Sequence, residues 1–394
     1  MNFSVSRNER SERSGNVASV RKSYKYKLRA TADQERMLDE TLWHCRNLYN
    51  AALEQRIYAY RKCGVSVTRY QQEAELKDIR AAMPEYAAMH SHVVQDVLAR
   101  LDTTFQAFFK RLKAGQTPGF PRFQPRTRYH SFTYKEFGNG ARLDNGFLVL
   151  SKIGRVAVRW SRPMEGKPKT VTLSHEPDGW YVMFSCADVP EQPLPLTGQE
   201  TGIDVGLKVF LITADGLVID NPRYHRKAER QLAKAQRRVS KRQQGSHRRK
   251  KAAQHCAKQY QTVKRQRADF QHKTARQLVQ TYDTIYLEEL QVSNLMRNRH
   301  LAKSIADAGW GQFRITLAYK AACAGKQVVA VPPQDTSQDC SGALSNGQRC
   351  GTRVQKSLSV RTHVCPTCGL VMDRDENAAR NIQWAGQALR GLAG

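Results

Sequence analysis

The feature that most constrains this chain of 394 residues is a group of four cysteines near its C-terminus, Cys340, Cys350, Cys365 and Cys368. The last two belong to the sequence Cys-Pro-Thr-Cys-Gly, in which both thiolates can turn toward one ion and the glycine permits a tight backbone turn. Cys340 and Cys350 would supply the other two ligands. Since four thiolates complete one tetrahedral site, we predict a structural zinc ion and a zinc ribbon at this point of the chain.

The spacing of these cysteines is wider than in an ordinary zinc knuckle, because nine residues separate Cys340 from Cys350. The simplest account is a two-residue knuckle enlarged by the polar loop 341–349. His363 is a competing ligand, but it stands too close to Cys365 to be preferred. The alternative is a thiol pair without metal in a reducing compartment. The remaining cysteines are scattered, which argues against a disulfide framework: Cys45, Cys63, Cys186, Cys256 and Cys323.

Basic residues dominate the composition: 64 lysines and arginines face 35 acids, for a formal net charge of +29. Such an excess costs stability through self-repulsion, so we expect a polyanionic partner. A membrane surface is also polyanionic, but no apolar run approaches the roughly 18 residues of a spanning helix. Residues 1–21 are polar and lack the apolar stretch of a signal peptide. We interpret them as a flexible leader and expect an intracellular, cytoplasmic protein without a membrane partner.

Helical patterns dominate residues 31–113. Thr31 and Gln34 form a capping box, and a second helix is expected around residues 70–82. A third helix carries one apolar stripe, which consists of Val94, Leu98, Leu101, Phe105, Phe108 and Leu112. We therefore predict a helical bundle.

Strand patterns flank this bundle on both sides. Residues 23–30 alternate in polarity, and short alternating segments separated by turn residues follow between 128 and 188. They predict a small β-barrel that the first strand joins, so that the bundle is an insertion in the barrel. Residues 192–198, with two prolines, are expected to be a linker.

The second half predicts an α/β arrangement. Strand patterns cover 203–213 and 217–219 around a turn at Asp215-Gly216, and recur at 284–288 and 327–331. A single helix is expected over 301–324.

A long helical hairpin, about residues 222–280 and broken near Gly245-Ser246, separates the first of these strands from the later ones. Between Arg223 and Arg276 it carries 19 lysines and arginines against two acids, a net charge of about +17. A charge run is often only a solvated face, but this imbalance is too one-sided for internal ion pairs. We expect contact with nucleic-acid phosphates, for example through Arg237, Arg238, Lys241 and Arg242.

Two acids lie on predicted strands. Asp204 stands between Ile203 and Val205, where an unpartnered carboxylate is costly to bury, so we interpret it as a metal or phosphate ligand. Glu288 ends the strand 284–288 on the face opposite Ile285 and Leu287. Its neighbour Glu289 is an alternative that shares the Ile285 face.

A third acid, Asp375, opens the last helix. It shares a helix face with Ala378, Ala379 and Ile382, whose small alanines allow close packing on a sheet. Asp373 is better explained as the helix cap.

Three carboxylates at one sheet edge suit two Mg²⁺ ions, because hard cations prefer oxygen ligands. Two ions about 3.5–4 Å apart can activate a water and stabilise the leaving 3′ oxygen of a phosphodiester. A rival is the actin-like ATPase class, in which Gly-Ile-Asp-Val-Gly also precedes a hairpin. That class needs phosphate and adenosine loops with paired glycines, and this sequence contains no Gly-Gly pair.

Five motifs in this order make the sequence similar to TnpB-type proteins, transposon-encoded RNA-guided nucleases related to type V CRISPR effectors. The resemblance extends from about Lys22 to near the C-terminus. It is carried by Pro118–Phe123, Gly202–Lys208, Asp269–Lys273, Ser304–Phe313 and Arg361–Asn381.

The resemblance implies a multidomain α/β fold with an RNase H-like RuvC nuclease domain at residues 199–335 and 370–394. A zinc ribbon at 336–369 would be inserted in it. A wedge β-barrel at 22–30 and 114–198 would precede it and carry the recognition bundle, 31–113.

The resemblance also implies functional residues and partners. Asp204, Glu288 and Asp375 match the family's catalytic, Mg²⁺-binding residues, and Tyr70, Gln95 and Thr133 fall in its motif-reading region. The expected function is RNA-guided, Mg²⁺-dependent cleavage of double-stranded DNA beside a short flanking motif, for a transposable element. We expect a bacterial or archaeal, nucleoid-associated protein that acts as a monomer with a guide RNA. The alternative is an RNA-guided repressor without cleavage, which the presence of all three acids disfavours.

Overall fold

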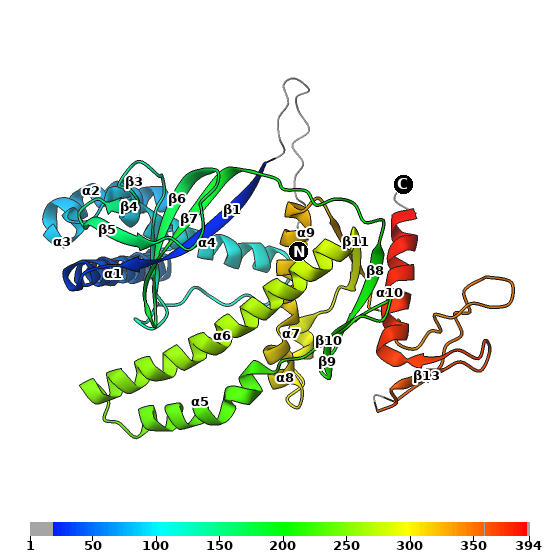
Figure 1. The fold of residues 1–394 in the computed structure, drawn as a ribbon. Coiled ribbons are helices and arrows are strands. Elements are labelled where there is room, and N and C mark those ends of the chain that lie inside the picture. Colours follow the sequence, from blue (N-terminus) through cyan, green and yellow to red (C-terminus); the bar gives the residue numbers. More distant parts are fainter. Residues whose placement is uncertain (1–18, 334, 358, 392–394) are drawn as a thin grey trace. The chain divides into compact units, whose positions relative to one another are not determined.

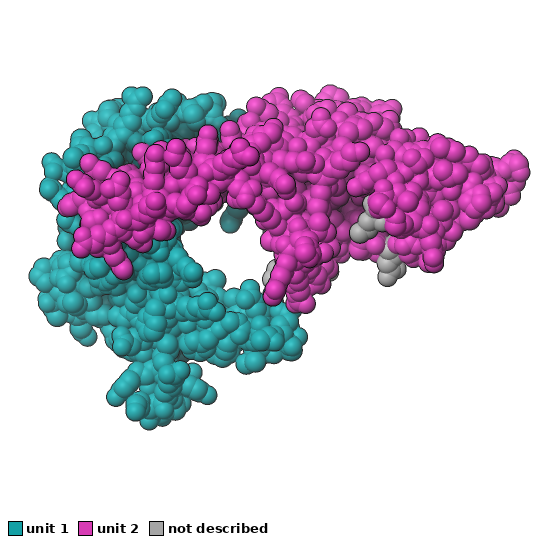
Figure 2. Space-filling view, turned by 90° about the horizontal axis from the view of Figure 1, so that it is seen from below, with its two compact units in different colours: residues 1–190 teal, residues 191–394 magenta. Residues whose placement is uncertain are grey.

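The computed structural model describes residues 19–333, 335–357 and 359–391. The chain divides into two compact units, unit 1 over residues 1–190 and unit 2 over residues 191–394 (Figure 2). Of the predicted leader, residues 1–18 lie outside the described residues, whereas residues 19–21 already belong to the first strand. Among the described helices, none is at once long and apolar enough to cross a bilayer.

Unit 1 contains one antiparallel sheet of seven strands, which curves into a barrel-like form (Figure 1). The order is β2-β6-β7-β1-β5-β4-β3, so the first strand of the chain lies in the middle of the sheet. Polarity alternates along the strands, and in β7 it buries Trp180, Val182 and Phe184 on one face. The strands are β1 (Ser19–Arg29), β2 (Ser131–Tyr134), β3 (Ala141–Asp144), β4 (Phe147–Leu150), β5 (Gly154–Arg159), β6 (Lys167–Glu176) and β7 (Gly179–Pro190).

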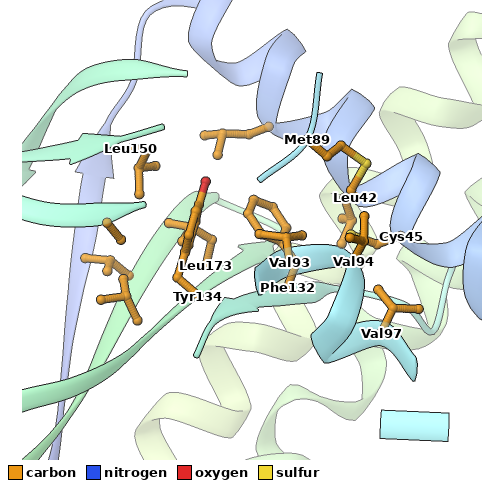
Figure 3. Packing of buried hydrophobic residues seen from close by; sticks show 14 of the residues in the cluster. Leu42, Cys45, Met89, Val93, Val94, Val97, Phe132, Tyr134, Leu150 and Leu173 are labelled. Atoms are coloured by element: carbon orange, nitrogen blue, oxygen red, sulfur yellow. The ribbon is translucent and has the colours of Figure 1, made fainter. Parts of the chain in front are cut away.

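Helices fill the segment between β1 and β2. They are α1 (Ala32–Cys63), α2 (Arg69–Ala82), α3 (Pro84–Ala87) and α4 (Ser91–Lys113). The predicted capping box at Thr31 and Gln34 is present. Val94, Leu98 and Leu101 are buried, but the stripe ends before Leu112, whose side chain is 54% exposed at the end of α4. Helix and sheet side chains share one core (Figure 3).

Unit 2 is built on a five-stranded sheet of order β10-β9-β8-β11-β12. β8, β9 and β10 are antiparallel neighbours, while β11 runs parallel to both β8 and β12. The expected strand 203–213 is two strands, because Gly206 to Lys208 turn the chain. The bounds are β8 (Glu200–Val205), β9 (Val209–Thr213), β10 (Val218–Asp220), β11 (Thr284–Glu288) and β12 (Gln327–Val331).

Helices cover both faces of this sheet. Ile203 and Ile285 pack with side chains of α6 and α9 on one face, and Tyr286 packs with Ile382 of α10 on the other. The expected helix 301–324 is wrong as a single element, because Gly309 adopts a left-handed conformation (φ 68°) that ends α8. The helices are α5 (Tyr224–Ser240), α6 (His247–Thr281), α7 (Val292–Leu295), α8 (Ala302–Ala308), α9 (Trp310–Cys323) and α10 (Arg374–Gly391).

A short two-stranded ribbon, β13 (Thr362–Val364) and β14 (Val371–Asp373), precedes α10. The four cysteines of the predicted zinc site lie in and around this ribbon.

Candidate functional site

The carboxyl ends of the parallel strands β8 and β11 meet at one edge of the unit 2 sheet. Asp204 lies near the end of β8 and Glu288 ends β11, and both side chains are half-buried. Alternation along β8 places Asp204 on the same face as Gly202, and alternation along β11 places Glu288 on the same face as Tyr286. Gly202 and Tyr286 both face α10. The two acids therefore point to the side of the sheet that this helix covers.

Asp375 comes to this edge from the first turn of α10. Asp373 caps the helix: its Oδ1 accepts the backbone N–H groups of Asp375 at 2.8 Å and Glu376 at 3.3 Å. Behind Asp375, the face formed by Ala378, Ala379 and Ile382 is buried.

Two of the three carboxylates, Asp204 and Glu288, have raised pKa values. Burial, followed by the negative charges of Glu288 and then Asp375, holds the pKa of Asp204 well above its usual value, while Arg374 opposes the shift. Burial also raises the pKa of Glu288, against a hydrogen bond of 2.5 Å from the Thr336 hydroxyl. Within the described residues the three acids are not drawn into as compact a group as the cysteines below. They nevertheless form a desolvated cluster of like charge.

Such a cluster fits divalent cations. Carboxylate oxygens are the ligands that Mg²⁺ prefers, and a cation would relieve the repulsion that shifts the Asp204 pKa. Arg361 is the nearest basic partner, with its Nη1 at 3.4 Å from Oδ2 of Asp375.

Close packing of α10 fixes where Asp375 stands. A Cβ on Gly202 would lie 2.0 Å from the Ala379 carbonyl oxygen, and a Cβ on Gly386 would lie 2.0 Å from the Tyr286 ring. The helix can therefore approach β8 and β11 only because both positions are glycine. At its far end, Arg390 pairs with Glu200 and donates to the Tyr286 hydroxyl at 2.9 Å.

The four cysteines converge as predicted. Their sulfur atoms all lie within 4.8 Å of one another, with Cys340 Sγ at 3.4 Å from Cys368 Sγ and Cys350 Sγ at 3.6 Å from Cys365 Sγ. Tetrahedral zinc with Zn–S bonds of about 2.3 Å separates its sulfurs by roughly 3.8 Å, so the set fits one zinc ion. Burial raises the Cys365 pKa, but the backbone N–H groups of Cys368 and Thr367 outweigh it and lower the pKa to about 6.

The widened knuckle closes through a small hairpin. The Cys350 N–H donates to the Gly342 carbonyl at 2.7 Å, and Ala343 bridges to Arg349. Gly342 is required here, because a Cβ would lie 2.8 Å from Cys368 Sγ. His363 is fully buried but is not among the clustered ligands.

Two buried asparagines join the zinc-site segment to α10. The Asn377 Oδ1 accepts from the Ser341 N–H at 3.0 Å, and the Asn377 and Asn381 amides both donate to the Asp339 carbonyl, at 2.8 and 2.7 Å. The cysteine cluster is therefore tied to the helix that carries Asp375. Sequence analysis missed these asparagines together with Thr336 and Arg361. The only available signal was that three of the four lie in the motif 361–381.

The basic cluster of the hairpin lies at the end of α5 and in the following turn. Arg237, Arg238, Lys241 and Arg242 are all exposed, while Leu232 and Ala235 are buried against α6.

The three expected motif-reading residues lie in unit 1. Tyr70 is 75% exposed on α2, and Gln95 lines an open pocket with residues of α2 and α4. The Thr133 hydroxyl is already engaged, accepting from Arg100 at 2.7 Å and lying 2.9 Å from the Thr172 hydroxyl.

Comparison with known proteins identifies the family. The chain is 36% identical over 385 residues to a candidate RNA-guided DNA endonuclease of Streptomyces pristinaespiralis, covering 94% of this chain and 90% of the relative. The chain belongs to the TnpB family. InsQ of Escherichia coli K12, also named as a candidate RNA-guided DNA endonuclease, is 27% identical over 394 residues, 93% of this TnpB-family chain and 92% of InsQ.

Three family models match parts of this TnpB-family protein. Their descriptions are a helix-turn-helix domain (19–64), a probable transposase (182–299) and a Cas12f1-like TNB domain (310–382). The second contains Asp204 and Glu288, and the third contains Asp375 and the four cysteines. A solved complex of Cas12f1 with sgRNA and target DNA superposes only loosely, with a TM-score of 0.35 and 14% identity over 92% of this chain and 99% of that one. Family membership confirms the prediction of a nuclease.

Proposed function

We propose that this TnpB-family protein is a guide-RNA-dependent endonuclease that cuts DNA phosphodiester bonds at the Asp204, Glu288 and Asp375 cluster. The observation that carries the proposal is the convergence of these acids at one sheet edge, where burial and then the charges of Glu288 and Asp375 raise the pKa of Asp204. The strand order, with three antiparallel strands followed by two parallel ones, supports an RNase H-like RuvC domain. Its relatives, named as candidate RNA-guided DNA endonucleases, support the substrate and the guide.

The three carboxylates would hold two Mg²⁺ ions, which when bound activate water and stabilise the leaving 3′ oxygen. Thr336 would orient Glu288, since its hydroxyl donates to Oε1, and Arg361 would set the rotamer of Asp375. The cysteines would hold one zinc ion whose role is structural: it fixes the segment that enters α10. Burial around Asp204 limits water at the site, which strengthens each charge interaction there.

The two units would divide the recognition task. In unit 1 the barrel would act as the wedge domain and the bundle around Tyr70 and Gln95 as the reader of a short flanking DNA motif. Thr133 would support the reader through Arg100. In unit 2 the hairpin would bind phosphates of the guide RNA or of its hybrid with DNA. We expect one chain for each guide RNA.

Asp204→Ala tests the chemistry. With guide RNA and Mg²⁺, cleavage of a matched DNA target should fall by about a thousandfold or more, since metal stabilisation of the transition state supplies several kcal/mol. DNA binding should be retained. The matched control is Glu289→Ala, because Glu289 is the exposed acid that directly follows β11. Undiminished cleavage by Asp204→Ala would exclude the assignment and leave the RNA-guided repressor as the better description.

A further inference from the structure

A polar cavity opens in unit 2 at the turn that follows β8. It has a volume of about 290 Å³ and lies between the turn that joins β8 to β9, the start of α5, and α8. Leu207, Asn221 and Asp307 line it together with the cations Lys208, Arg223, Arg226 and Lys303, and with His225 and Ser304. Two of the motifs found in the sequence, 202–208 and 304–313, meet at this cavity. The residues that they contribute to its lining are not part of the carboxylate cluster.

The walls of the cavity are fixed by internal contacts. Arg223, held at a positive φ of 50°, donates through Nη2 to the carbonyls of Leu207 and Lys208 at 3.3 Å. Asn221 Nδ2 donates to the Leu207 carbonyl at 3.1 Å. The buried Asp307 accepts the backbone N–H groups of His225 at 2.9 Å and Arg226 at 3.1 Å, so its charge is committed to the start of α5. A strained residue and a buried acid therefore hold the turn and the helix in place.

The remaining polar groups of the cavity differ in how far they are engaged by protein partners. Lys303 pairs with Glu229. Across the described part of the chain, neither Lys208 nor the Arg226 guanidinium donates a hydrogen bond to a protein group, and the half-buried Ser304 hydroxyl has no partner either. Lys208, the Arg226 guanidinium, whose charge is also attracted to the Glu229 carboxylate, and the Ser304 hydroxyl together make a receptor for an oxyanion such as phosphate.

The position of the cavity indicates which phosphate it takes. Lys208 follows Asp204 by four residues, so their Cα atoms are at most about 14 Å apart. One strand of nucleic acid advances about 3.4 Å per nucleotide, so this span corresponds to roughly four nucleotides.

We propose that the cavity holds a backbone phosphate of the DNA strand that lies in the carboxylate site, within about four nucleotides of the cut bond. This inference rests on the proposed function. Lys208 and Arg226 would be binding residues that set the register of the strand, because phosphate contacts position a nucleic acid without carrying sequence information.

The test maps single phosphates by neutralising them. In the Asp204→Ala background with guide RNA, binding is measured for targets that carry one methylphosphonate linkage, moved one nucleotide at a time along the strand. One position near the cut bond should weaken binding by about tenfold, the size expected for a charge-assisted contact. In the variant Lys208→Ala/Arg226→Ala, binding of the unmodified target should weaken and that position should lose its penalty.

The matched control is Lys227→Ala/Arg230→Ala, which removes the same charge from α5 outside the cavity and should keep the position-specific penalty. Melting curves check that each variant folds. The proposal is overturned if the loss of binding at that position persists in Lys208→Ala/Arg226→Ala. It is also overturned if no single methylphosphonate near the cut bond weakens binding by the wild-type protein. In the second arm, the methylphosphonate linkage is moved along the guide RNA instead of the DNA. If Lys208→Ala/Arg226→Ala abolishes a penalty in the RNA and none in the DNA, the cavity binds an RNA phosphate and the DNA assignment is overturned. Because the readout is binding, a failure of cleavage chemistry remains distinguishable.

Discussion

The two edges of the unit 2 sheet treat acidic residues in opposite ways. At the edge where β8 and β11 begin, Asp283 pairs with Lys326 and accepts the N–H groups of Thr197 and Gly198, at 3.0 and 2.7 Å. The Lys326 contact, followed by these N–H groups, holds the pKa of Asp283 well below its usual range. At the edge where the same strands end, burial and neighbouring carboxylates raise the pKa of Asp204.

Glu200 belongs to the first kind. Burial raises its pKa, but hydrogen bonds from Tyr286, Arg390 and Gln387 outweigh this and lower it. The difference shows which acidic residues receive hydrogen bonds and counter-ions from the chain itself. Asp283 and Glu200 at the first edge have internal donors and serve stability, whereas at the second edge burial and like charge raise the pKa of Asp204, which fits the proposed cation site. A carboxyl whose pKa is raised by burial and by neighbouring carboxylates is typical of a functional site.

The zinc-site segment connects this contrast to metal chemistry. Cys365→Ser should lower the zinc content from about one ion per chain toward none, because one of four ligands is lost. Elemental analysis measures it, with the exposed Cys63→Ser as control. Cleavage should fall as well, since the segment is joined through Asn377 to the helix that carries Asp375, while the first edge should stay intact. A metal-free, fully folded wild-type protein would refute the four-cysteine site.

The hairpin adds a cluster of exposed cations to this comparison. Replacing Arg237, Arg238, Lys241 and Arg242 by alanine should weaken RNA or RNA–DNA binding. It should also flatten the plot of log affinity against log salt by up to about three units, at roughly 0.7–0.9 per phosphate contact. Preference among target sequences should not change, because phosphates carry no base information. An unchanged salt slope would place this cluster away from nucleic acid.

Sequence patterns predicted the elements whose cause is local. Strand patterns located β4, β11 and β12 to the residue, and the Thr31 capping box located the start of α1. Patterns failed where a glycine interrupts a continuous apolar run, as Gly206 does between β8 and β9 and Gly309 does between α8 and α9. A glycine in a sequence tolerates a turn but does not require one. Whether the chain turns at that glycine is therefore decided by tertiary packing.

The residues of the candidate site likewise include some that the sequence pattern predicts and some that it does not. Periodicity placed Glu288 and Asp375 on the faces where they are found, whereas Asp204 was predicted from the cost of burying an acid between Ile203 and Val205. The groups that orient them, Thr336 and Arg361, come from segments without regular pattern, and no spacing rule links them to the acids. The engagement of Thr133 by Arg100 is likewise a contact across the fold that a strand pattern cannot contain.

Breaking the satisfied edge should cost stability and spare chemistry. Asp283→Asn removes the charge that Lys326 faces, and the melting temperature should fall by a few degrees while cleavage per folded molecule is kept. The folded-state pKa of Asp283 is lowered from 3.8, so its contribution is complete above that pH and is lost as pH falls through the lower folded-state value. The gap between wild type and variant should therefore be constant from pH 7 to about pH 5 and shrink below pH 4. A gap independent of pH would contradict this.

Neutralising Asp204, at the edge where β8 and β11 end, should raise the stability instead. This should be the smallest effect among the four variants. The folded-state pKa of Asp204 lies well above 3.8, so between 3.8 and that raised value the folded state binds more protons than the unfolded state. Without Mg²⁺, this carboxyl therefore lowers the free energy of unfolding as pH rises. Asp204→Asn should melt like the wild type near pH 4 and above it at pH 7, opposite in sign to Asp283→Asn. Added Mg²⁺ should stabilise the wild type more than the variant, because the cation needs the carboxylate. Melting curves of both variants at pH 4 and pH 7 test these opposite signs. If Asp204→Asn is less stable than the wild type at pH 7, the charge of Asp204 is already compensated by groups of the chain itself.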